Sequence, residues 1–272
     1  MAMITWICAT CGVAYPAAEA VPERCPICED SRQYVGANGQ EWTTMERLRE
    51  AHRNEMREEE PGLASIHTAP GFAIGQRAFL VDTGDGNVLW DCLTLIDDET
   101  IAWVRERGGI RAMAISHPHY YSSMRAWSEA FGNCPIWIHA DDRQWVVSQA
   151  PQVTYWSGET QPLFGGLTLV RSGGHFDGYQ VLHWPAGAGG AGALFAGDQP
   201  QVCMDRRWVT FMYSYPNMIP FDAPTVRRIT DTLEPLAFTR LYGAFGRHVL
   251  DDAKPVIARS RDRYLRAIGV SF

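Results

Sequence analysis

ISHPHYYSS, residues 115–123, places two histidines just past the end of a predicted buried strand, residues 110–116. One residue separates His117 from His119, so in a loop both imidazoles can face the same ion. A histidine pair alone is equally consistent with hydrogen-bonded histidines of a protein core. It indicates a metal site only when other segments of the chain supply further ligands.

Three other segments supply candidate ligands. SGGHFDG, residues 172–178, holds His175 in a glycine-rich loop after a predicted strand. LFAGD, residues 194–198, ends an apolar strand with Asp198, and GAFGRH, residues 243–248, holds His248 in a second glycine-rich loop. Since loops at strand ends can meet at one edge of a sheet, we expect these side chains to converge there with the histidine pair.

Strands and helices alternate around these segments. Strands are predicted at residues 78–82, 87–91, 110–116, 135–139, 167–171, 179–184 and 193–197, and helices at 98–108, 122–132, 222–233 and 251–268. The stretch PAGAGGAGA, residues 185–193, is predicted to be a flexible hairpin loop. This alternation predicts an α/β sandwich.

The ligand order resembles that of the metallo-β-lactamase superfamily. That family reads H-x-H-x-D-H, then a histidine in a glycine-rich loop, then a strand that ends in Gly-Asp, then a late G-x-H. The resemblance covers residues 70–250. It implies a four-layer αβ/βα sandwich that binds one or two zinc or iron ions, and an enzyme that hydrolyses esters, thioesters, lactams or phosphodiesters.

The resemblance also assigns roles to single residues. His117, His119 and His175 match the ligands of the family's first metal, and Asp198 matches the carboxylate that bridges the two metals. His248 matches the remaining protein ligand of the second metal. Asp91, at the end of the strand 87–91, matches an early aspartate that lies behind the ligands.

The chain departs from the motif at two positions. Tyr121 and Ser122 stand where the family has Asp and His. The second metal therefore loses two of its usual ligands, and the aspartate that orients the nucleophilic water is missing. We expect one zinc or iron ion at this site. Tyr120 and Tyr121 are candidate catalytic residues, as donors to a developing oxyanion or as acids, or they are aromatic filler.

Other residues near the predicted site are weaker candidates. His139, Asp141 or Asp142 could replace the lost ligands, although structural roles are the more common explanation. Residues 200–220 are rich in aromatic residues and methionine and contain Arg206 and Arg207. This segment is either an apolar substrate wall with an anion-binding pair or the lining of a core.

The N-terminal part carries a second metal motif. Two C-x-x-C pairs, Cys8 with Cys11 and Cys25 with Cys28, can present four thiolates to one tetrahedral ion. Residues 1–41 are too short to form a core without such a staple. Residues 4–35 resemble a rubredoxin-type ribbon, which holds either iron for electron transfer or structural zinc, and we expect zinc.

The charged residues 42–62 are predicted to be an exposed linker helix. They are rich in helix-forming side chains and end at Pro61-Gly62. The predicted organisation is thus a ribbon over 1–41, a linker helix over 42–62 and a metallo-β-lactamase-like domain over 63–272.

Composition restricts the partners. The 272 residues carry a formal net charge of −7, which argues against a broad nucleic-acid-binding face. We expect no membrane span, because the apolar runs are short, and a cytoplasmic location, because the N-terminus does not read as a signal peptide. Ten tryptophans and the aromatic segment 208–215 would suit a homodimer.

Three functions fit this pattern. The first is a hydrolase of small-molecule substrates with one metal ion. The second is a redox protein in which an iron-loaded ribbon passes electrons to an iron in the sandwich. The third is a binding protein that keeps the fold without catalysis.

Overall fold

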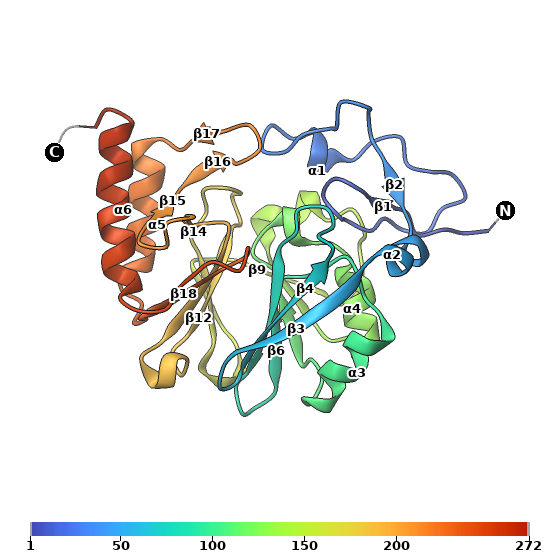
Figure 1. Ribbon diagram of the computed structural model, residues 1–272, viewed down its shortest axis with the longest axis horizontal. Coiled ribbons are helices and arrows are strands. Elements are labelled where there is room, and N and C mark those ends of the chain that lie inside the picture. Colours follow the sequence, from blue (N-terminus) through green and yellow to red (C-terminus); the bar gives the residue numbers. More distant parts are fainter. Residues whose placement is uncertain (1, 271–272) are drawn as a thin grey trace.

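The computed structural model describes residues 2–270, which form two facing sheets with helices on both outer sides (Figure 1). The first sheet has the strand order β3-β4-β5-β6-β7-β8-β9, and the second has the order β10-β11-β12-β13-β18-β19. The helices α3 (Asp98–Glu106) and α4 (Met124–Ala130) cover the first sheet, and α5 (Ala223–Leu233) and α6 (Ala253–Ala267) cover the second. The four layers are those of an αβ/βα sandwich.

The strands of the first sheet are β3 (Arg53–Glu60), β4 (Leu63–Ala69), β5 (Arg77–Asp82), β6 (Asn87–Trp90), β7 (Ala112–Ala114), β8 (Ile136–His139) and β9 (Val153–Trp156). The strands of the second sheet are β10 (Thr160–Pro162), β11 (Thr168–Arg171), β12 (Gln180–Trp184), β13 (Ala193–Gly197), β18 (Arg240–Gly243) and β19 (His248–Val249). The remaining short elements are β1 (Ile7–Cys8), α1 (Pro26–Glu29), β2 (Trp42–Thr43), α2 (Met45–Ala51), β14 (Gln201–Val202), β15 (Val209–Thr210), β16 (Met212–Ser214) and β17 (Ile219–Pro220). The strands and helices expected from residue 78 onward are present, with ends shifted by a few residues.

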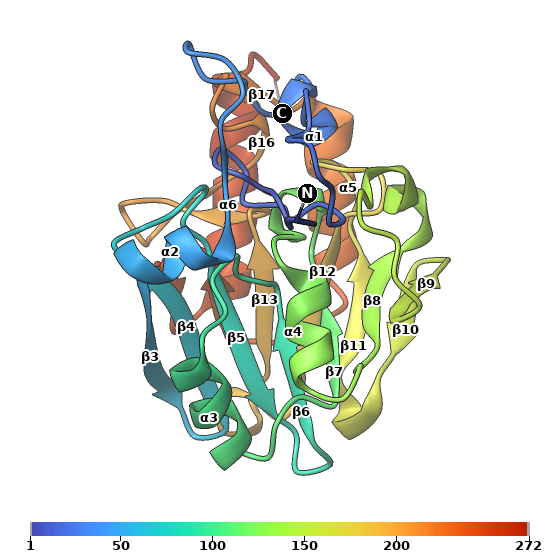
Figure 2. The same ribbon diagram turned by 90° about the vertical axis from the view of Figure 1, so that its right-hand side faces the viewer.

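Alternating side chains hold the layers together. On β5, Phe79 and Val81 face the core between the two sheets, whereas Ala78 and Leu80 face the core under α3 and α4. Successive side chains of a strand point to opposite faces of the sheet. Because both faces of these sheets are covered, the strands are continuous apolar runs in the sequence. The second sheet has its own outer core with α5 and α6. Figure 2 looks onto the first sheet with α3 and α4 in front of it.

The predicted linker helix is wrong over most of its length. Only α2 (Met45–Ala51) is helical, and β3 (Arg53–Glu60) is an edge strand that pairs with β4. The sequence of β3, RNEMREEE, favours a helix by composition. Pairing with β4 overrides that preference, and as an edge strand with one open side β3 tolerates many charged residues.

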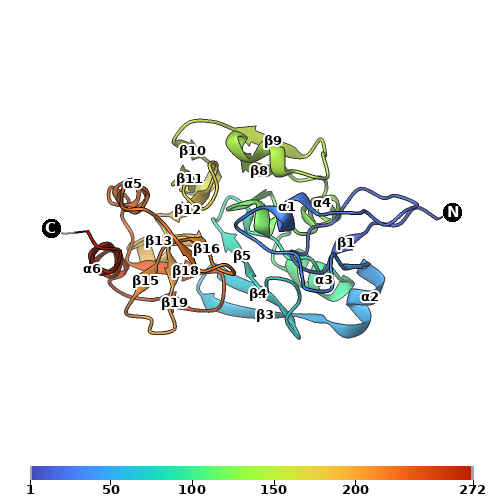
Figure 3. The same cartoon turned by 90° about the horizontal axis from the view of Figure 1, so that it is seen from above.

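The ribbon, residues 2–41, packs directly on the sandwich. Its cysteines and Val13 belong to the same buried core as Leu93 and Tyr121. The Ala14 N–H donates to the Ser122 carbonyl at 3.0 Å. Viewed from above, the ribbon lies over the first sheet and α4 (Figure 3). Among the described helices, none is long and apolar enough to cross a membrane.

Candidate metal centre

The histidine pair lies on a single 3-10 turn. The turn, Pro118–Tyr120, begins directly after His117 and follows β7. Pro118 occupies the first position of the turn, where its fixed φ suits the backbone and no N–H is needed. The His117 and His119 side chains are both buried, so the loop presents its imidazoles inward rather than to solvent.

His175 and Asp198 reach the same place from the second sheet. His175 follows β11 and Asp198 follows β13. Both strands run antiparallel to β12 between them, so their ends lie at one edge. The Gln180 side chain at the start of β12 donates to the Ile115 carbonyl at 2.7 Å and ties this edge to the end of β7. We call His117, His119, His175 and Asp198 the histidine site.

The donor atoms of the histidine site all lie within 4.8 Å of one another. His119 Nδ1 is 3.3 Å from His175 Nε2, and His117 Nε2 is 3.3 Å from Asp198 Oδ2. His117 Nε2 is buried and has no hydrogen-bond partner among the described residues. Three imidazole nitrogens and a carboxylate oxygen that converge in a buried space fit one zinc or ferrous ion.

Burial keeps these imidazoles neutral. It lowers the pKa of His119 well below its usual value, and it lowers the pKa of His175 to about 3. Burial also lowers the pKa of His117, although Asp198 opposes the change. A neutral imidazole has a free lone pair, which a metal requires. Burial would raise the pKa of Asp198, but the nearby His117 imidazole foremost, and the hydrogen bond from Tyr120, lower it overall. The site therefore contains three neutral donors and one anion.

A ring of polar contacts fixes the donors. Ser116 Oγ lies 2.9 Å from His117 Nδ1, and the Ser116 N–H donates to Asp91 at 2.7 Å. Asp91 thus lies behind the ligands, as the resemblance implies. The Tyr120 hydroxyl donates to Asp198 Oδ1. This bond leaves Asp198 Oδ2 free to face the imidazoles.

Three contacts around the site were not predicted from the sequence. The Tyr179 hydroxyl accepts from the Asp198 N–H at 2.7 Å, and the Tyr215 hydroxyl donates to the Asp198 carbonyl at 2.7 Å. Arg32, from the ribbon, donates to the His175 carbonyl at 3.1 Å. Tyr215 lies in the aromatic segment 200–220 and Tyr179 lies four residues after His175, but no local pattern predicts that their hydroxyls contact Asp198 or that Arg32 of the ribbon contacts His175.

Tyr120→Phe tests the hydrogen bond to Asp198. We expect the affinity of the histidine site for its metal to fall about tenfold or more, as for other residues that orient a ligand. The free energy of unfolding should fall by ~1–3 kcal/mol, because a buried carboxylate oxygen loses its donor. Chelator competition and urea unfolding measure the two effects.

Tyr121→Phe is the matched control, since it removes a tyrosine hydroxyl from the neighbouring residue. The Tyr121 hydroxyl lies 3.5 Å from the Asp142 carbonyl, which is too long for a strong bond. Equal losses in the two variants would show that Tyr120 has no special role.

Two predicted site residues lie elsewhere. Tyr121 lines a different cavity, beside Val13 and Ala14 of the ribbon, and its hydroxyl lies near the Asp142 carbonyl rather than near Asp198. His248 lies on β19 with its ring 5.0 Å from Tyr242 and 5.9 Å from Phe79, and it is outside the histidine site. The loop 244–247 turns the chain back, so that His248 pairs with Tyr242 alongside β18, and Phe245 lines the cavity at the end of that strand instead. The expected ligand of a second metal is therefore not with the first set.

The weaker candidates also lie apart from the histidine site. His139 Nε2 is 3.1 Å from the Gly158 carbonyl, and Asp141 forms an ion pair with Arg171 at 2.8 Å. Asp142 accepts the Gly178 N–H at 2.8 Å. All three have structural partners, so none replaces a lost ligand.

Asp142 should make stability depend on pH. Burial raises its pKa to about 7, although the Gly178 N–H opposes the shift. The folded state therefore keeps this proton while the unfolded state releases it near pH 4, and stability falls as pH rises from about 4 to 7. Asp142→Asn removes this loss. We expect the melting temperature of the variant, relative to that of the wild type, to rise between pH 5 and pH 8. Asp85→Asn, in an exposed turn, should have the melting temperature of the wild type at every pH. A pH-independent difference would contradict the assignment.

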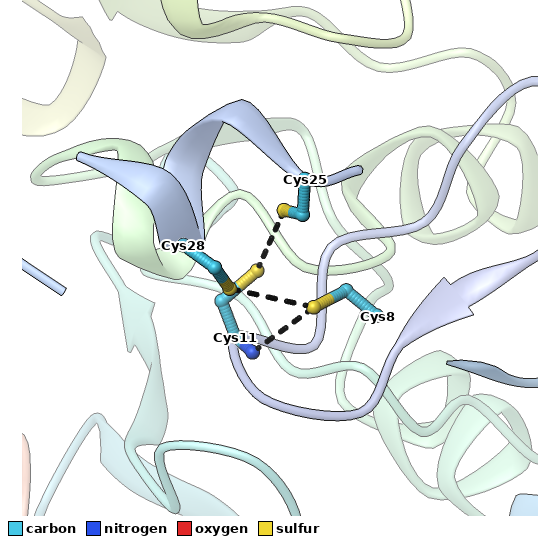
Figure 4. A group of neighbouring side chains, drawn as sticks. All are labelled: Cys8, Cys11, Cys25 and Cys28. Atoms are coloured by element: carbon cyan, nitrogen blue, oxygen red, sulfur yellow. Dashed lines mark hydrogen bonds between the residues drawn. The ribbon is translucent and has the colours of Figure 1, made fainter. Parts of the chain in front are cut away.

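The four cysteines form a second cluster, which we call the cysteine site. Cys8 Sγ lies 3.5 Å from Cys28 Sγ, and Cys11 Sγ lies 3.7 Å from Cys25 Sγ (Figure 4). These separations exclude disulfides, whose sulfurs are about 2.05 Å apart. They agree with the edges of a tetrahedron around an ion with metal–sulfur bonds of about 2.3 Å. The predicted ligand set is thus brought together.

Two local features shape the cysteine site. The Gln40 side chain donates to Cys8 Sγ at 3.0 Å. Gly12 has a φ of +80°, and a Cβ there would lie 2.2 Å from Thr94 Oγ1, so only glycine fits. Thr94 donates to the Gly12 carbonyl at 2.9 Å. The knuckle that holds the first cysteine pair is therefore seated on the first sheet.

A cavity of about 220 Å³ opens onto the histidine site. Its lining residues are Thr10, Gln33, Tyr34, Ala73, Ile74, His119, His175, Asp198, Gln201, Tyr215, Pro216 and Phe245. The segment 200–220 contributes three of them, so the predicted wall is present in part. Arg207 instead pairs with Asp205 at 2.8 Å in an exposed loop. The predicted anion-binding pair is not part of the cavity.

Comparison with protein-family models gives no match. The uncharacterized protein YmaE of Bacillus subtilis (strain 168) is 49% identical over 265 residues, which cover 97% of this chain and 96% of YmaE. A relationship of this extent includes the ribbon as well as the sandwich.

Solved structures of metallo-β-lactamases have the same fold. The DIM-1 metallo-β-lactamase has a TM-score of 0.60 at 13% identity, over 79% of this chain and 98% of its own. The enzyme from Pontibacter korlensis has a TM-score of 0.57 at 14% identity, over 78% and 99%. FIM-1 from Pseudomonas aeruginosa, in its mono-zinc form, has a TM-score of 0.55 at 15% identity, over 77% and 95%. The expected fold is thereby confirmed.

Proposed function

This chain belongs to the same protein family as YmaE and has the metallo-β-lactamase fold, and from these premises we propose that it is a metal-dependent hydrolase with one ion in the histidine site. The observation that carries the proposal is the convergence of three neutral imidazoles and one carboxylate within 4.8 Å at the floor of a cavity. A merely structural cluster would not need buried nitrogens without hydrogen-bond partners.

We propose one ion rather than two. Within residues 2–270, the histidine and cysteine sites are the groups of three or more ligand-type residues that could hold a metal. The positions that supply the other ligands of the second metal in the family hold Tyr121 and Ser122 in this chain, and His248 lies outside the histidine site. FIM-1 has been solved in a mono-zinc form, which supports the proposal that this fold can hold a single ion.

The chemistry divides between the ion and the chain. A bound zinc or ferrous ion supplies Lewis acidity and lowers the pKa of a water molecule toward about 7. The chain holds Asp198 ionised and oriented through Tyr120, which makes Tyr120 a positioning residue. The small cavity restricts water around a substrate. Hydrolysis then adds the elements of water across the scissile bond, with one product taking hydroxyl and the other a proton.

We propose zinc in the cysteine site. Four thiolates also suit iron, and an iron-loaded ribbon would favour the redox alternative. Metal analysis and the visible spectrum of the purified protein decide between them, because an oxidised iron–tetrathiolate centre is red and zinc is colourless. Red protein with one iron per ribbon would overturn the zinc assignment.

Hydrolysis is tested with the metal-loaded protein and the chelated protein side by side. We expect two metal ions per chain and turnover of at least one substrate among esters, thioesters, lactams and phosphodiesters. Chelation should abolish turnover, and added zinc or ferrous ion should restore it. Two bound ions with no turnover across the panel would count against the hydrolase and favour a binding protein.

A further inference from the structure

The ribbon forms one wall of the cavity over the histidine site. Thr10 comes from the knuckle of the first cysteine pair, and Gln33 and Tyr34 follow the second pair. They line the same cavity as His119 and His175. Residues of the ribbon and residues of the histidine site therefore line one cavity.

Side chains of the segment 214–217 hold the backbone of residues 31–33 in this wall. The Asn217 side chain donates to the Ser31 and Gln33 carbonyls at 3.1 and 2.9 Å. Ser214 Oγ donates to the Arg32 carbonyl at 3.0 Å. Figure 1 shows the β16–β17 hairpin beside this part of the ribbon. The backbone of the wall is thus held rigidly.

Gln33 is the unusual side chain of the wall. It is 6% exposed, and its Oε1 is buried with no hydrogen-bond partner in the described part of the chain. Both backbone groups of Gln33 are hydrogen-bonded, since its N–H donates to the Asp30 carbonyl at 3.0 Å and its carbonyl accepts from Asn217. Buried carboxamides are ordinarily hydrogen-bonded. Gln33 is among the residues that line the cavity, so a ligand bound there can supply a partner to its carboxamide.

The lining of the cavity also restricts the charge of a ligand. No lysine or arginine is among the lining residues that the structure describes. The nearby Arg32 is neutralised by Asp30, with Nη2 and Oδ2 2.9 Å apart, and its guanidinium lies 4.0 Å from the centre of the Phe176 ring. An anionic substrate such as a phosphodiester would have no side-chain cation to meet. Ala73, Ile74 and Phe245 instead offer an apolar surface.

We propose that Gln33 is a substrate-binding residue whose carboxamide hydrogen-bonds a polar group of an uncharged acyl compound, an ester, thioester or amide. The inference rests on the proposed hydrolase function and narrows its substrate class. It gives the ribbon a direct part in substrate recognition, beyond stabilising the chain.

Gln33→Met is the test, because methionine keeps the length and removes the hydrogen-bonding groups. Gln161→Met, on β10 and away from the cavity, is the matched control. Phenyl acetate reports hydrolysis of an uncharged ester, bis(p-nitrophenyl) phosphate reports an anionic diester, and acetanilide reports binding of an uncharged amide by calorimetry. Metal content and melting temperature are measured for each variant.

We expect wild-type protein to prefer phenyl acetate to the phosphodiester. Gln33→Met should raise KM for phenyl acetate and Kd for acetanilide about tenfold each, with kcat within about twofold and metal content unchanged, as for loss of a ground-state hydrogen bond. Gln161→Met should match wild type. Preference for the phosphodiester would overturn the charge assignment.

The outcomes separate this inference from the hydrolase proposal. If the wild type hydrolyses phenyl acetate and Gln33→Met has the same KM and Kd as the wild type, the role of Gln33 is overturned and the hydrolase proposal is retained. Absence of hydrolysis, together with acetanilide binding that Gln33→Met weakens, supports Gln33 and overturns the hydrolase. Neither hydrolysis nor binding by wild type overturns both.

Discussion

Replacing His117 and His119 together with alanine is expected to remove one metal ion per chain and to lower hydrolysis by at least about 1,000-fold. Two of the three imidazole donors are lost, and the remaining His175 and Asp198 are too few to hold a zinc or ferrous ion tightly. Without the ion, no group in the site lowers the pKa of water toward neutrality. Metal analysis after dialysis and initial rates measure the two effects.

His52→Ala is the control for this experiment. His52 lies at the end of α2, where its Nδ1 is 2.8 Å from the Pro70 carbonyl, and it belongs neither to the histidine site nor to the lining of the cavity. It should keep both ions and full turnover. If the double variant also retained two ions, the histidine site would not be a metal site and the hydrolase proposal would fall with it.

Replacing Cys25 and Cys28 together with serine is expected to destabilise the whole chain, not the ribbon alone. Four thiolates share one ion, so two cannot hold it, and the binding energy of such an ion is folding energy. The cysteines lie in the same core as the first sheet. We expect a loss of at least ~5 kcal/mol in the free energy of unfolding, a large part of the stability of an ordinary domain. Thermal and urea unfolding of the holoprotein measure it.

Cys203→Ser is the control, because Cys203 is a partly exposed free thiol outside the cysteine site. It should change stability by less than about 1 kcal/mol. A double cysteine variant that lost only the ribbon signal, with the sandwich unfolding at its usual temperature, would show that the ribbon and sandwich are energetically independent.

Local patterns in the sequence determined the strands and helices whose side chains face cores. The apolar runs at β7 and β13 pack on both faces, so composition and periodicity indicated them correctly. The edge strand β3 was predicted to be a helix, because its charged residues carry no strand pattern and its conformation comes from pairing with β4. The conformation of such an edge strand depends on its partner more than on its own side-chain pattern.

The candidate ligands divide in the same way. His117, His119, His175 and Asp198 could be selected from the sequence, because each lies within a few residues of the end of a strand and the strands end at one edge. His248 follows a strand too, but the four-residue loop before it turns back and places it alongside Tyr242 of β18, short of that edge. Loop length and direction are properties of packing that no local motif encodes.

By itself, the sequence determined which donors exist: two C-x-x-C pairs, a histidine pair, and a histidine and an aspartate at strand ends. Their chemistry and spacing follow from the chain alone. Only the tertiary structure decided that the Tyr120 hydroxyl contacts Asp198 while the Tyr121 hydroxyl lies near Asp142, and that Gln33 of the ribbon lines the cavity. Those outcomes depend on how separately folded segments dock, and docking is set by shape and burial across the whole molecule rather than by any local pattern.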